Sequence, residues 1–121
     1  MARRILILED AEDICASMKE LLEMEGFEVI CASNGLEAMQ YLDSTSTRPD
    51  LILLDLMMPV MDGYAFRTEQ KKRPELSTIP VVVMTAATDP HAKVKELEPE
   101  GLLKKPFKDI ATILKSIERF L

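Results

Sequence analysis

The sequence predicts an α/β fold in which a doubly wound parallel sheet of five strands is flanked by five helices. Strand-like and helix-like segments alternate along the whole chain, which favours repeated strand–helix units. The strand-like segments at residues 5–8 and 51–54 are continuous aliphatic runs, the pattern of strands that are covered by helices on both faces. We therefore expect one layer of helices on each side of the sheet.

Three strands are expected in the first half of the chain, at residues 4–8, 27–32 and 51–54. Between the first two, residues 12–25 carry apolar side chains at helical spacing, and Gly26 can end this helix in the left-handed conformation. The apolar stripe consists of Ile14, Met18, Leu21 and Leu22. A second helix is expected at residues 36–42, after the turn at Ser33-Asn34-Gly35.

Two further strands are expected in the second half, at residues 79–84 and 101–104. Residues 59–63 are expected to form a loop, because they contain proline and an Asp-Gly pair, and a helix should follow at residues 64–73. Asp89-Pro90 provides an N-cap and a proline at the first helical position, so a short fourth helix should start there. The last helix is expected at residues 108–121. Its apolar stripe consists of Ile110, Ile113, Leu114, Ile117 and Leu121.

The composition argues against nucleic-acid and membrane binding. The chain has 121 residues, a net charge of −6 and no long Lys/Arg block. It also has no apolar stretch long enough to cross a bilayer. This length suits one compact domain over residues 1–121. Cys15 and Cys31 have neither metal-ligand spacing nor a secreted framework around them, so we expect reduced thiols in or near the core of a cytoplasmic protein.

Chemically active side chains follow four of the five expected strands, at the points where the strands end. They are Glu9-Asp10 after the first strand, Asp55 after the third, Thr85 after the fourth and Lys104-Lys105 after the fifth. Each one alone is typical of a helix cap, a turn or a solvated surface. However, the carboxyl ends of parallel strands meet at one edge of the sheet, where ligands bind in open α/β folds. Because these side chains are expected at the same edge of the sheet, we interpret them together as a functional site.

Three carboxylates at one edge repel one another unless a positive charge is shared between them. We expect that charge to be Mg²⁺, held by Glu9, Asp10 and Asp55, because divalent cations of this kind take oxygen ligands. Asp55 could then act as the nucleophile in phosphoryl transfer to a carboxylate. A hydroxyl from Thr85 and a lysine ammonium would stabilise the phosphoryl oxygens as charge builds on them.

Along essentially its full length the chain resembles the CheY-like receiver domain of bacterial two-component response regulators. The resemblance rests on four segments in the family's order: Glu9-Asp10, residues 54–63 (LDLMMPVMDG), Thr85-Ala86 and Lys105-Pro106-Phe107. It implies a flavodoxin-like sheet with strand order 2-1-3-4-5. It also implies a cytoplasmic signalling switch, not a turnover enzyme, which works as a monomer or weak homodimer. The phosphoryl group would come from a sensor histidine kinase or a phosphotransfer protein, and the signal would pass to an unknown downstream protein by direct contact.

The resemblance also implies roles for the acidic residues. Asp55 would be the phosphoacceptor. Asp10 would ligate Mg²⁺ directly, and Glu9 would act mainly through a metal-bound water. Met57 would offer its backbone carbonyl to the metal, which leaves the identity of its side chain free for that task.

Further roles follow for the fourth and fifth strands. Thr85 would hydrogen-bond the phosphoryl group and move toward it. Lys105, which directly precedes the proline, would pair with the phosphoryl oxygens. The peptide bond between Lys105 and Pro106 is expected to be cis, which would aim the lysine inward.

The chain departs from the family pattern at three positions. Leu102 stands where receivers usually have an aromatic residue that swings inward as the threonine moves, so we expect no signalling through an aromatic switch. Met57 and Ala87 lie two positions after Asp55 and Thr85, and neither side chain can orient a water by hydrogen bonding. We therefore expect slow self-dephosphorylation.

Two alternatives use the same residues. A haloacid-dehalogenase-like phosphatase also has a nucleophilic Asp after a strand, but it needs a second Asp two positions later, where this chain has Met57. A phosphorylation-independent pseudo-receiver, acting only as an interaction module, stays open because of Leu102 and the short segment between Thr85 and Lys105. The glycine-rich motifs of nucleotide-binding proteins do not occur.

Overall fold

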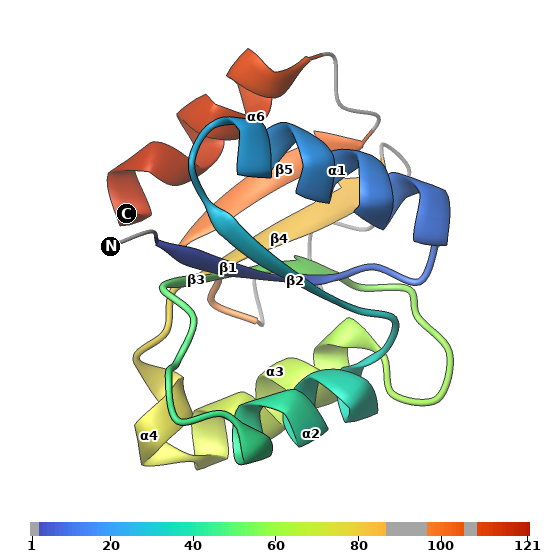
Figure 1. Ribbon diagram of the computed structural model, residues 1–121. Helices are drawn as coiled ribbons and strands as arrows, with labels where there is room; N and C mark the ends of the chain where they lie inside the picture. Colours follow the sequence, from blue (N-terminus) through green and yellow to red (C-terminus); the bar gives the residue numbers. More distant parts are fainter. Residues whose placement is uncertain (1–2, 87–96, 106–108) are drawn as a thin grey trace.

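The computed structural model describes residues 3–86, 97–105 and 109–121, and contains a five-stranded sheet of order β2-β1-β3-β4-β5 (Figure 1). The strands are β1 (Arg4–Leu8), β2 (Glu28–Ala32), β3 (Leu51–Asp55), β4 (Val81–Ala86) and β5 (Gly101–Lys105). All neighbouring strands are parallel. The expected fold class and strand order are confirmed.

Helices cover both faces of this sheet (Figure 1). One face carries α1 (Glu12–Met24) and α6 (Ile110–Ile117), and the other carries α2 (Gly35–Ser44), α3 (Gly63–Lys72) and the short α4 (Pro74–Ser77). A 3₁₀ turn (Glu118–Phe120) follows α6. No described helix has the length and hydropathy needed to traverse a bilayer.

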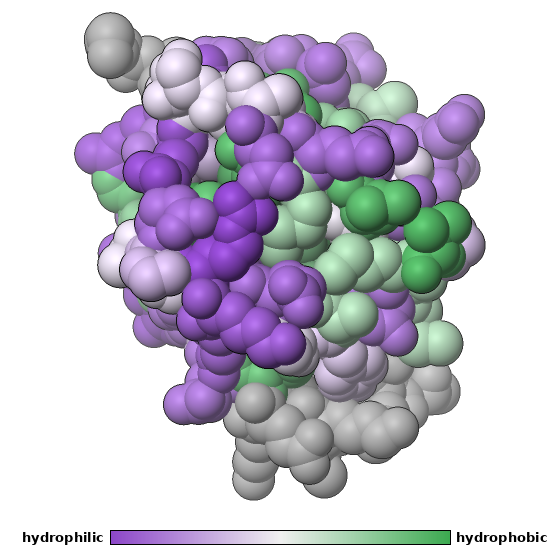
Figure 2. Space-filling model, turned by 90° about the horizontal axis from the view of Figure 1, so that it is seen from below, coloured by the Kyte–Doolittle hydropathy of each residue, from purple (hydrophilic) through white to green (hydrophobic). Residues whose placement is uncertain are grey.

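The central strands are buried on both sides, which explains their uninterrupted aliphatic sequence. Leu6 and Leu54 pack in a cluster with α2 and α3, whereas Ile7 and Leu53 pack in a second cluster with α1 and α6. Successive side chains of a strand point to opposite faces, so each strand must be apolar at every position. The outer surface seen from the α2, α3 and α4 side is largely hydrophilic, with apolar side chains gathered toward one side (Figure 2).

The helices differ from expectation in detail. α4 was not predicted, although Pro74 at its first position is a favoured helix start. The fourth helix expected after Asp89-Pro90 lies outside the described residues. α6 begins at Ile110, because the carboxylate of Asp109 accepts a hydrogen bond from the Thr112 backbone N–H at 2.9 Å and so caps the helix there.

The inward face of α1 was predicted incorrectly at two positions. Ile14 and Leu21 are 37% and 39% exposed, and the buried residues are Cys15, Met18 and Leu22. The apolar stripe is wider than the strip of helix that touches the sheet, so periodicity alone did not locate its centre. Gly26 does end the helix region as expected, with a φ of 94°.

The prediction that Cys15 and Cys31 are reduced thiols is wrong for this structure, in which a disulfide joins them. Their Cα atoms are 6.4 Å apart, and the bond links α1 to β2 across a sequence separation of 16 residues. The sequence did not reveal this pairing, because it depends on which face of α1 lies against β2. A cross-link that closes a loop of this length stabilises a fold by about 3 kcal/mol.

A buried polar pair on α3 holds the chain segments that enter β4 and β5. Arg67 is 4% exposed and Gln70 is fully buried. The Arg67 guanidinium donates to the carbonyl oxygens of Leu97 (2.9 Å) and Glu98 (2.8 Å), and to the Gln70 side-chain oxygen (2.8 Å). Burial lowers the pKa of Arg67, while Glu100 and Glu98 act in the opposite direction. These contacts also hold Glu98 in a left-handed conformation with a φ of 50°.

Gln70 completes this arrangement from its other end. Its Nε2 donates to the carbonyl oxygens of Leu76 at 3.0 Å and Ile79 at 3.1 Å, just before β4 begins. The buried Gln70 amide therefore links α3 to the segment that precedes β4. Through Arg67 it is also linked to the segment that precedes β5. These two strands carry Thr85 and Lys105.

Replacing Gln70 by Leu should lower the free energy of unfolding by about 3 kcal/mol, because buried hydrogen-bonding groups on Arg67, Leu76 and Ile79 would lose their partner. Urea denaturation followed by circular dichroism measures this change. Glu69→Gln is the matched control, since Glu69 is exposed on the same helix and its ion pair with Lys72 is worth at most about 0.5 kcal/mol. Equal stabilities for the two variants would contradict a supporting role for the buried amide.

Candidate functional site

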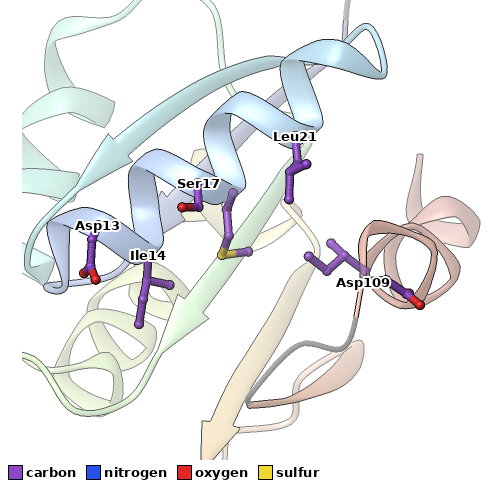
Figure 3. A pocket seen from close by; sticks show the side chains of 7 residues that line it. Asp13, Ile14, Ser17, Leu21 and Asp109 are labelled. Carbon is purple, nitrogen blue, oxygen red and sulfur yellow. The ribbon is translucent and has the colours of Figure 1, made fainter.

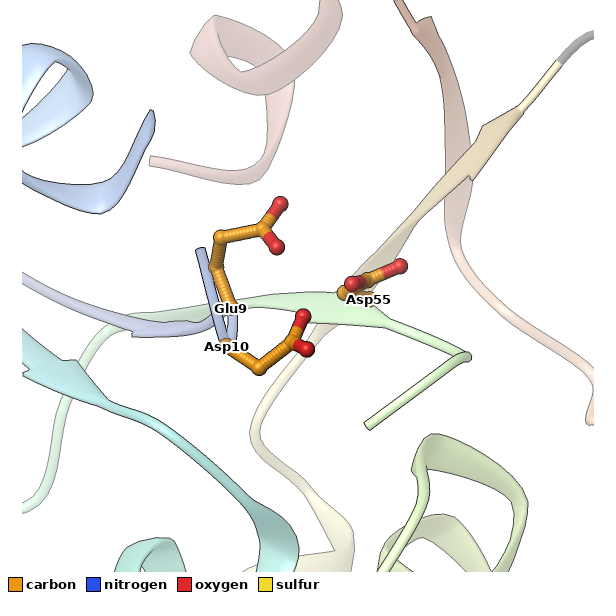
Figure 4. Close-up of side chains that lie close together, drawn as sticks. All are labelled: Glu9, Asp10 and Asp55. Atoms are coloured by element: carbon orange, nitrogen blue, oxygen red, sulfur yellow. The ribbon is translucent and has the colours of Figure 1, made fainter. Parts of the chain in front are cut away.

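Three carboxylates converge at the carboxyl edge of the sheet (Figure 4). Glu9 and Asp10 directly follow β1, and Asp55 is the last residue of β3. One carboxylate oxygen from each lies within 4.8 Å of the other two. The strand register explains why these acids are close. Leu8 pairs with Leu54, so the next residues, Glu9 and Asp55, lie side by side at the carboxyl ends of β1 and β3. The expected convergence of the three acids is present.

Two of these three acids are buried. Glu9 is 3% exposed and Asp55 is 7% exposed, whereas Asp10 is exposed. Two carboxylates about 5 Å apart repel by roughly 3 kcal/mol at the effective dielectric constant of a protein surface. Bringing three of them together is therefore costly, and a shared cation would reverse the sign of this interaction.

The donor set fits a small divalent cation. All three side chains supply hard carboxylate oxygens, the ligands that Mg²⁺ prefers in proteins. Mg²⁺ also retains several waters, and the exposed side of Asp10 leaves the cluster open to solvent. The Glu9 carboxylate is oriented by the Ala11 backbone N–H, which donates to its Oε2 at 3.3 Å. The backbone N–H of Glu9 donates to the Ala32 carbonyl at 3.0 Å. This bond extends the hydrogen-bond ladder between β1 and β2 by one residue.

The loop after Asp55 alternates between core and solvent. Leu56 and Met58 are buried, whereas the Met57 side chain is 71% exposed. The Met57 side chain, two positions after Asp55, therefore faces solvent. The chain then turns at Val60, which has a φ of 66°, and the Met61 N–H donates back to the Pro59 carbonyl at 2.7 Å. A left-handed β-branched residue is strained, and such strain is concentrated at functional sites.

Two glycines hold this loop against the helices that follow β2 and β3. A Cβ at Gly63 would lie 2.5 Å from the Asp55 carbonyl oxygen, and a Cβ at Gly35 would lie 2.8 Å from the Met61 side chain. The Gly35 N–H also donates to the Met61 carbonyl at 2.7 Å. The sequence marked both glycines only as turn residues. Their role in bringing α2 and α3 close to Asp55 depends on tertiary packing that the sequence does not display.

The remaining expected residues lie on the neighbouring strands. Asp55 pairs with Met84, so Thr85 is the next residue along the adjacent strand, and Lys105 pairs with Ala86 on the strand beyond. The register therefore places the backbones of Thr85 and Lys105 at the same edge as the acids. Their side chains, and the residues Ala87 and Pro106, lie outside what the structure describes. The cis peptide at Pro106 stays a prediction.

Leu102 lies in β5, opposite Val83, and is 39% exposed. It is therefore a surface residue of the edge strand. The absence of signalling through an aromatic switch at this position stays a prediction.

A groove of about 300 Å³ lies between α1 and α6 (Figure 3). Ile14 and Leu21 project from α1 toward it, and Asp13 and Asp109 supply acidic groups. Both aspartates lie at the starts of helices, and these helices leave the carboxyl edge of the sheet. The two apolar residues that the sequence placed in the core thus line a surface groove.

Comparison with known proteins agrees with this geometry. The family model described as the response regulator receiver domain matches residues 5–118. The chain is 38% identical over 106 residues to the transcriptional regulatory protein PrrA of Mycobacterium leprae, covering 86% of this chain and 44% of that protein. It therefore spans less than half the length of that curated relative.

Solved structures show the same fold. The chemotaxis response regulator CheY4 of Vibrio cholerae superimposes with a TM-score of 0.88 at 30% identity and covers both chains fully (100% each). The Mn²⁺-bound form of response regulator Rcp1 superimposes with a TM-score of 0.76 at 33% identity, over 93% of this chain and 87% of that one. With a family match over nearly all of its sequence and the acids in place at the sheet edge, the chain belongs to the response regulator receiver domains of two-component signalling.

Proposed function

We propose that this receiver domain is a phosphoacceptor switch that takes a phosphoryl group onto Asp55 in a Mg²⁺-dependent reaction. The observation that carries the proposal is the position of Asp55. It is a buried carboxylate at the end of a central strand, with the carboxylates of Glu9 and Asp10 within 4.8 Å. The family, and the existence of a Mn²⁺-bound form of Rcp1, support the binding of a divalent cation.

The chemistry assigns a part to each residue. Glu9, Asp10 and Asp55 would hold Mg²⁺, together with the backbone carbonyl of Met57. When bound, the ion would neutralise charge on the phosphoryl oxygens and act as a Lewis acid.

An Asp55 carboxylate oxygen attacks the phosphorus atom of a phosphohistidine donor. The new O–P bond forms as the P–N bond breaks, and the imidazole leaves with the electron pair. The Lys105 ammonium and the Thr85 hydroxyl would stabilise the phosphoryl oxygens that the cation does not contact. Asp55 is fixed at the end of a central strand, so we expect positioning to contribute much of the rate.

The output is a shift of population between two conformers that differ in affinity for a partner. We propose that a sensor histidine kinase or phosphotransfer protein donates the phosphoryl group, and that a downstream protein reads the result. The groove between α1 and α6 provides apolar contacts from Ile14 and Leu21, which suits a docking donor. We further propose a cytoplasmic location.

Incubation with acetyl phosphate and Mg²⁺ should add one phosphoryl group to the chain, detected by intact mass spectrometry. Asp55→Asn should abolish the adduct, because the amide is not a nucleophile. Removal of Mg²⁺ with a chelator should also prevent it. No adduct on the wild-type chain would support the phosphorylation-independent interaction module instead, and turnover of many phosphate esters would indicate a phosphatase.

Asp10→Asn should weaken Mg²⁺ binding about tenfold or more, because it removes one anionic ligand from the cluster. Isothermal titration calorimetry on the unphosphorylated chain measures the dissociation constant directly. Asp13→Asn is the matched control: Asp13 is an exposed acid in the first turn of α1 and is not a member of the cluster. Similar losses in both variants would mean that the ion responds to general surface charge, contrary to the proposal.

The double variant Met57→Asn, Ala87→Glu should lose its phosphoryl group faster than the wild-type chain, by roughly an order of magnitude. Both new side chains can orient an attacking water, which the native pair cannot. Decay of the phosphorylated mass after removal of acetyl phosphate gives the two rates. A faster decay in the native protein would overturn the assignment of these positions.

A further inference from the structure

We infer that the Cys15–Cys31 disulfide is a redox-sensitive clamp on Glu9, and that its reduction weakens Mg²⁺ binding at the acidic site. The inference rests on two parts of the proposed function, namely that the acids bind this cation and that the protein is cytoplasmic. Its observations are separate from the phosphorylation chemistry. They are the disulfide itself, the hydrogen bonds that surround Glu9, and a cavity that gives access to the sulfur atoms.

The disulfide joins the two segments that hold Glu9. Cys15 lies in the first half of α1, and Cys31 is the neighbour of Ala32 at the end of β2. The Glu9 backbone N–H donates to the Ala32 carbonyl at 3.0 Å. On the other side, the Ala11 N–H donates to the Glu9 carboxylate at 3.3 Å.

A third hydrogen bond closes a ring around this acid. The Cys15 N–H donates to the Ala11 carbonyl at 3.0 Å, so the residue that orients the Glu9 carboxylate is itself attached to the cysteine. The ring runs from Glu9 through Ala32 to Cys31, across the disulfide to Cys15, and back through Ala11. It fixes both the backbone and the carboxylate of Glu9, and the disulfide is its single covalent cross-connection.

A cavity of about 380 Å³ gives access to the bond. It is lined by both cysteines and by polar side chains that include Glu9, Lys19 and Glu37, so water and a small thiol can enter. Cys15 is 4% exposed and Cys31 is half-buried, so an incoming thiolate meets the sulfur of Cys31. In the cytoplasmic setting proposed above, an accessible disulfide is more often redox-sensing than structural.

The exchange with a dithiol reductant balances as a two-electron reaction. A thiolate of the reductant attacks the Cys31 Sγ, and the Cys15 Sγ leaves as a thiolate and takes a proton. The second thiol of the reductant then attacks the mixed disulfide and releases Cys31 as a thiol. The protein gains two electrons and two protons, and the reductant becomes a disulfide. The Cys15 carbonyl oxygen lies 3.6 Å from the Cys31 Sγ and can accept a weak hydrogen bond from the new thiol.

Reduction would leave the sheet and its ladder in place but remove the covalent link between α1 and β2. The Ala11 N–H, and with it the Glu9 carboxylate, would then sample more positions. A ligand that must be ordered when the ion binds contributes less affinity than one already in position. We expect the dissociation constant for Mg²⁺ to rise about three- to tenfold on reduction.

The test compares the oxidised and reduced forms of the 121-residue chain without any substitution. Samples equilibrated at graded ratios of reduced to oxidised dithiothreitol are alkylated, and intact mass gives the number of free thiols. Isothermal titration calorimetry of the fully oxidised and fully reduced samples gives the Mg²⁺ dissociation constants, with far-ultraviolet circular dichroism to verify that both are folded. Cys31→Ser should match the reduced chain and show no response to dithiothreitol.

Each outcome bears on a different claim. Weaker Mg²⁺ binding in the reduced chain, with an unchanged circular dichroism spectrum, supports the clamp. Equal dissociation constants in the two redox states would overturn it and leave the proposed function intact, since a merely structural disulfide changes the melting temperature alone. Free cysteines at every dithiothreitol ratio would also overturn it. Absence of Mg²⁺ binding by the oxidised chain would contradict the proposed function as well, and the thiol count would show that the bond itself had formed.

Discussion

The mutual repulsion of three carboxylates is the constraint on which this structure depends. Glu9, Asp10 and Asp55 are brought within 4.8 Å by the pairing of two parallel strands, and two of them are buried. Two isolated carboxylates at such a separation repel by roughly 3 kcal/mol at an effective dielectric constant near 20. This repulsion destabilises the empty site, and binding of a cation and then of a phosphoryl group would stabilise it.

The surroundings of the site hold the acids in place against that repulsion. Gly35 and Gly63 let α2 and α3 approach the loop that follows Asp55. The same loop contains the strained turn at Val60. On the other side of the cluster, the disulfide and three hydrogen bonds enclose Glu9. The Arg67–Gln70 pair performs a comparable task farther away, by fixing the approaches to β4 and β5.

The sequence was most informative where local pattern and tertiary role coincide. A strand covered on both faces must be apolar throughout, so β1 and β3 were predicted correctly, and the three acids at their carboxyl ends lie together as expected. It was least informative where packing between elements decides. Ile14 and Leu21 fit a helical stripe but lie beside a groove. The Cys15–Cys31 bond depends on the rotation of α1 against β2, and the burial of Arg67 depends on its contacts with Leu97 and Glu98, which are distant in sequence.

The most direct test of the central claim is the free energy of unfolding as a function of Mg²⁺ concentration, compared between the native chain and Asp10→Asn. Above its dissociation constant, the ion should stabilise the native chain by about 1.4 kcal/mol for each tenfold increase in concentration. Without the ion, Asp10→Asn should be the more stable protein, because one repulsive charge is gone. A native chain whose stability does not respond to Mg²⁺, and which is no less stable than Asp10→Asn in its absence, would contradict this account.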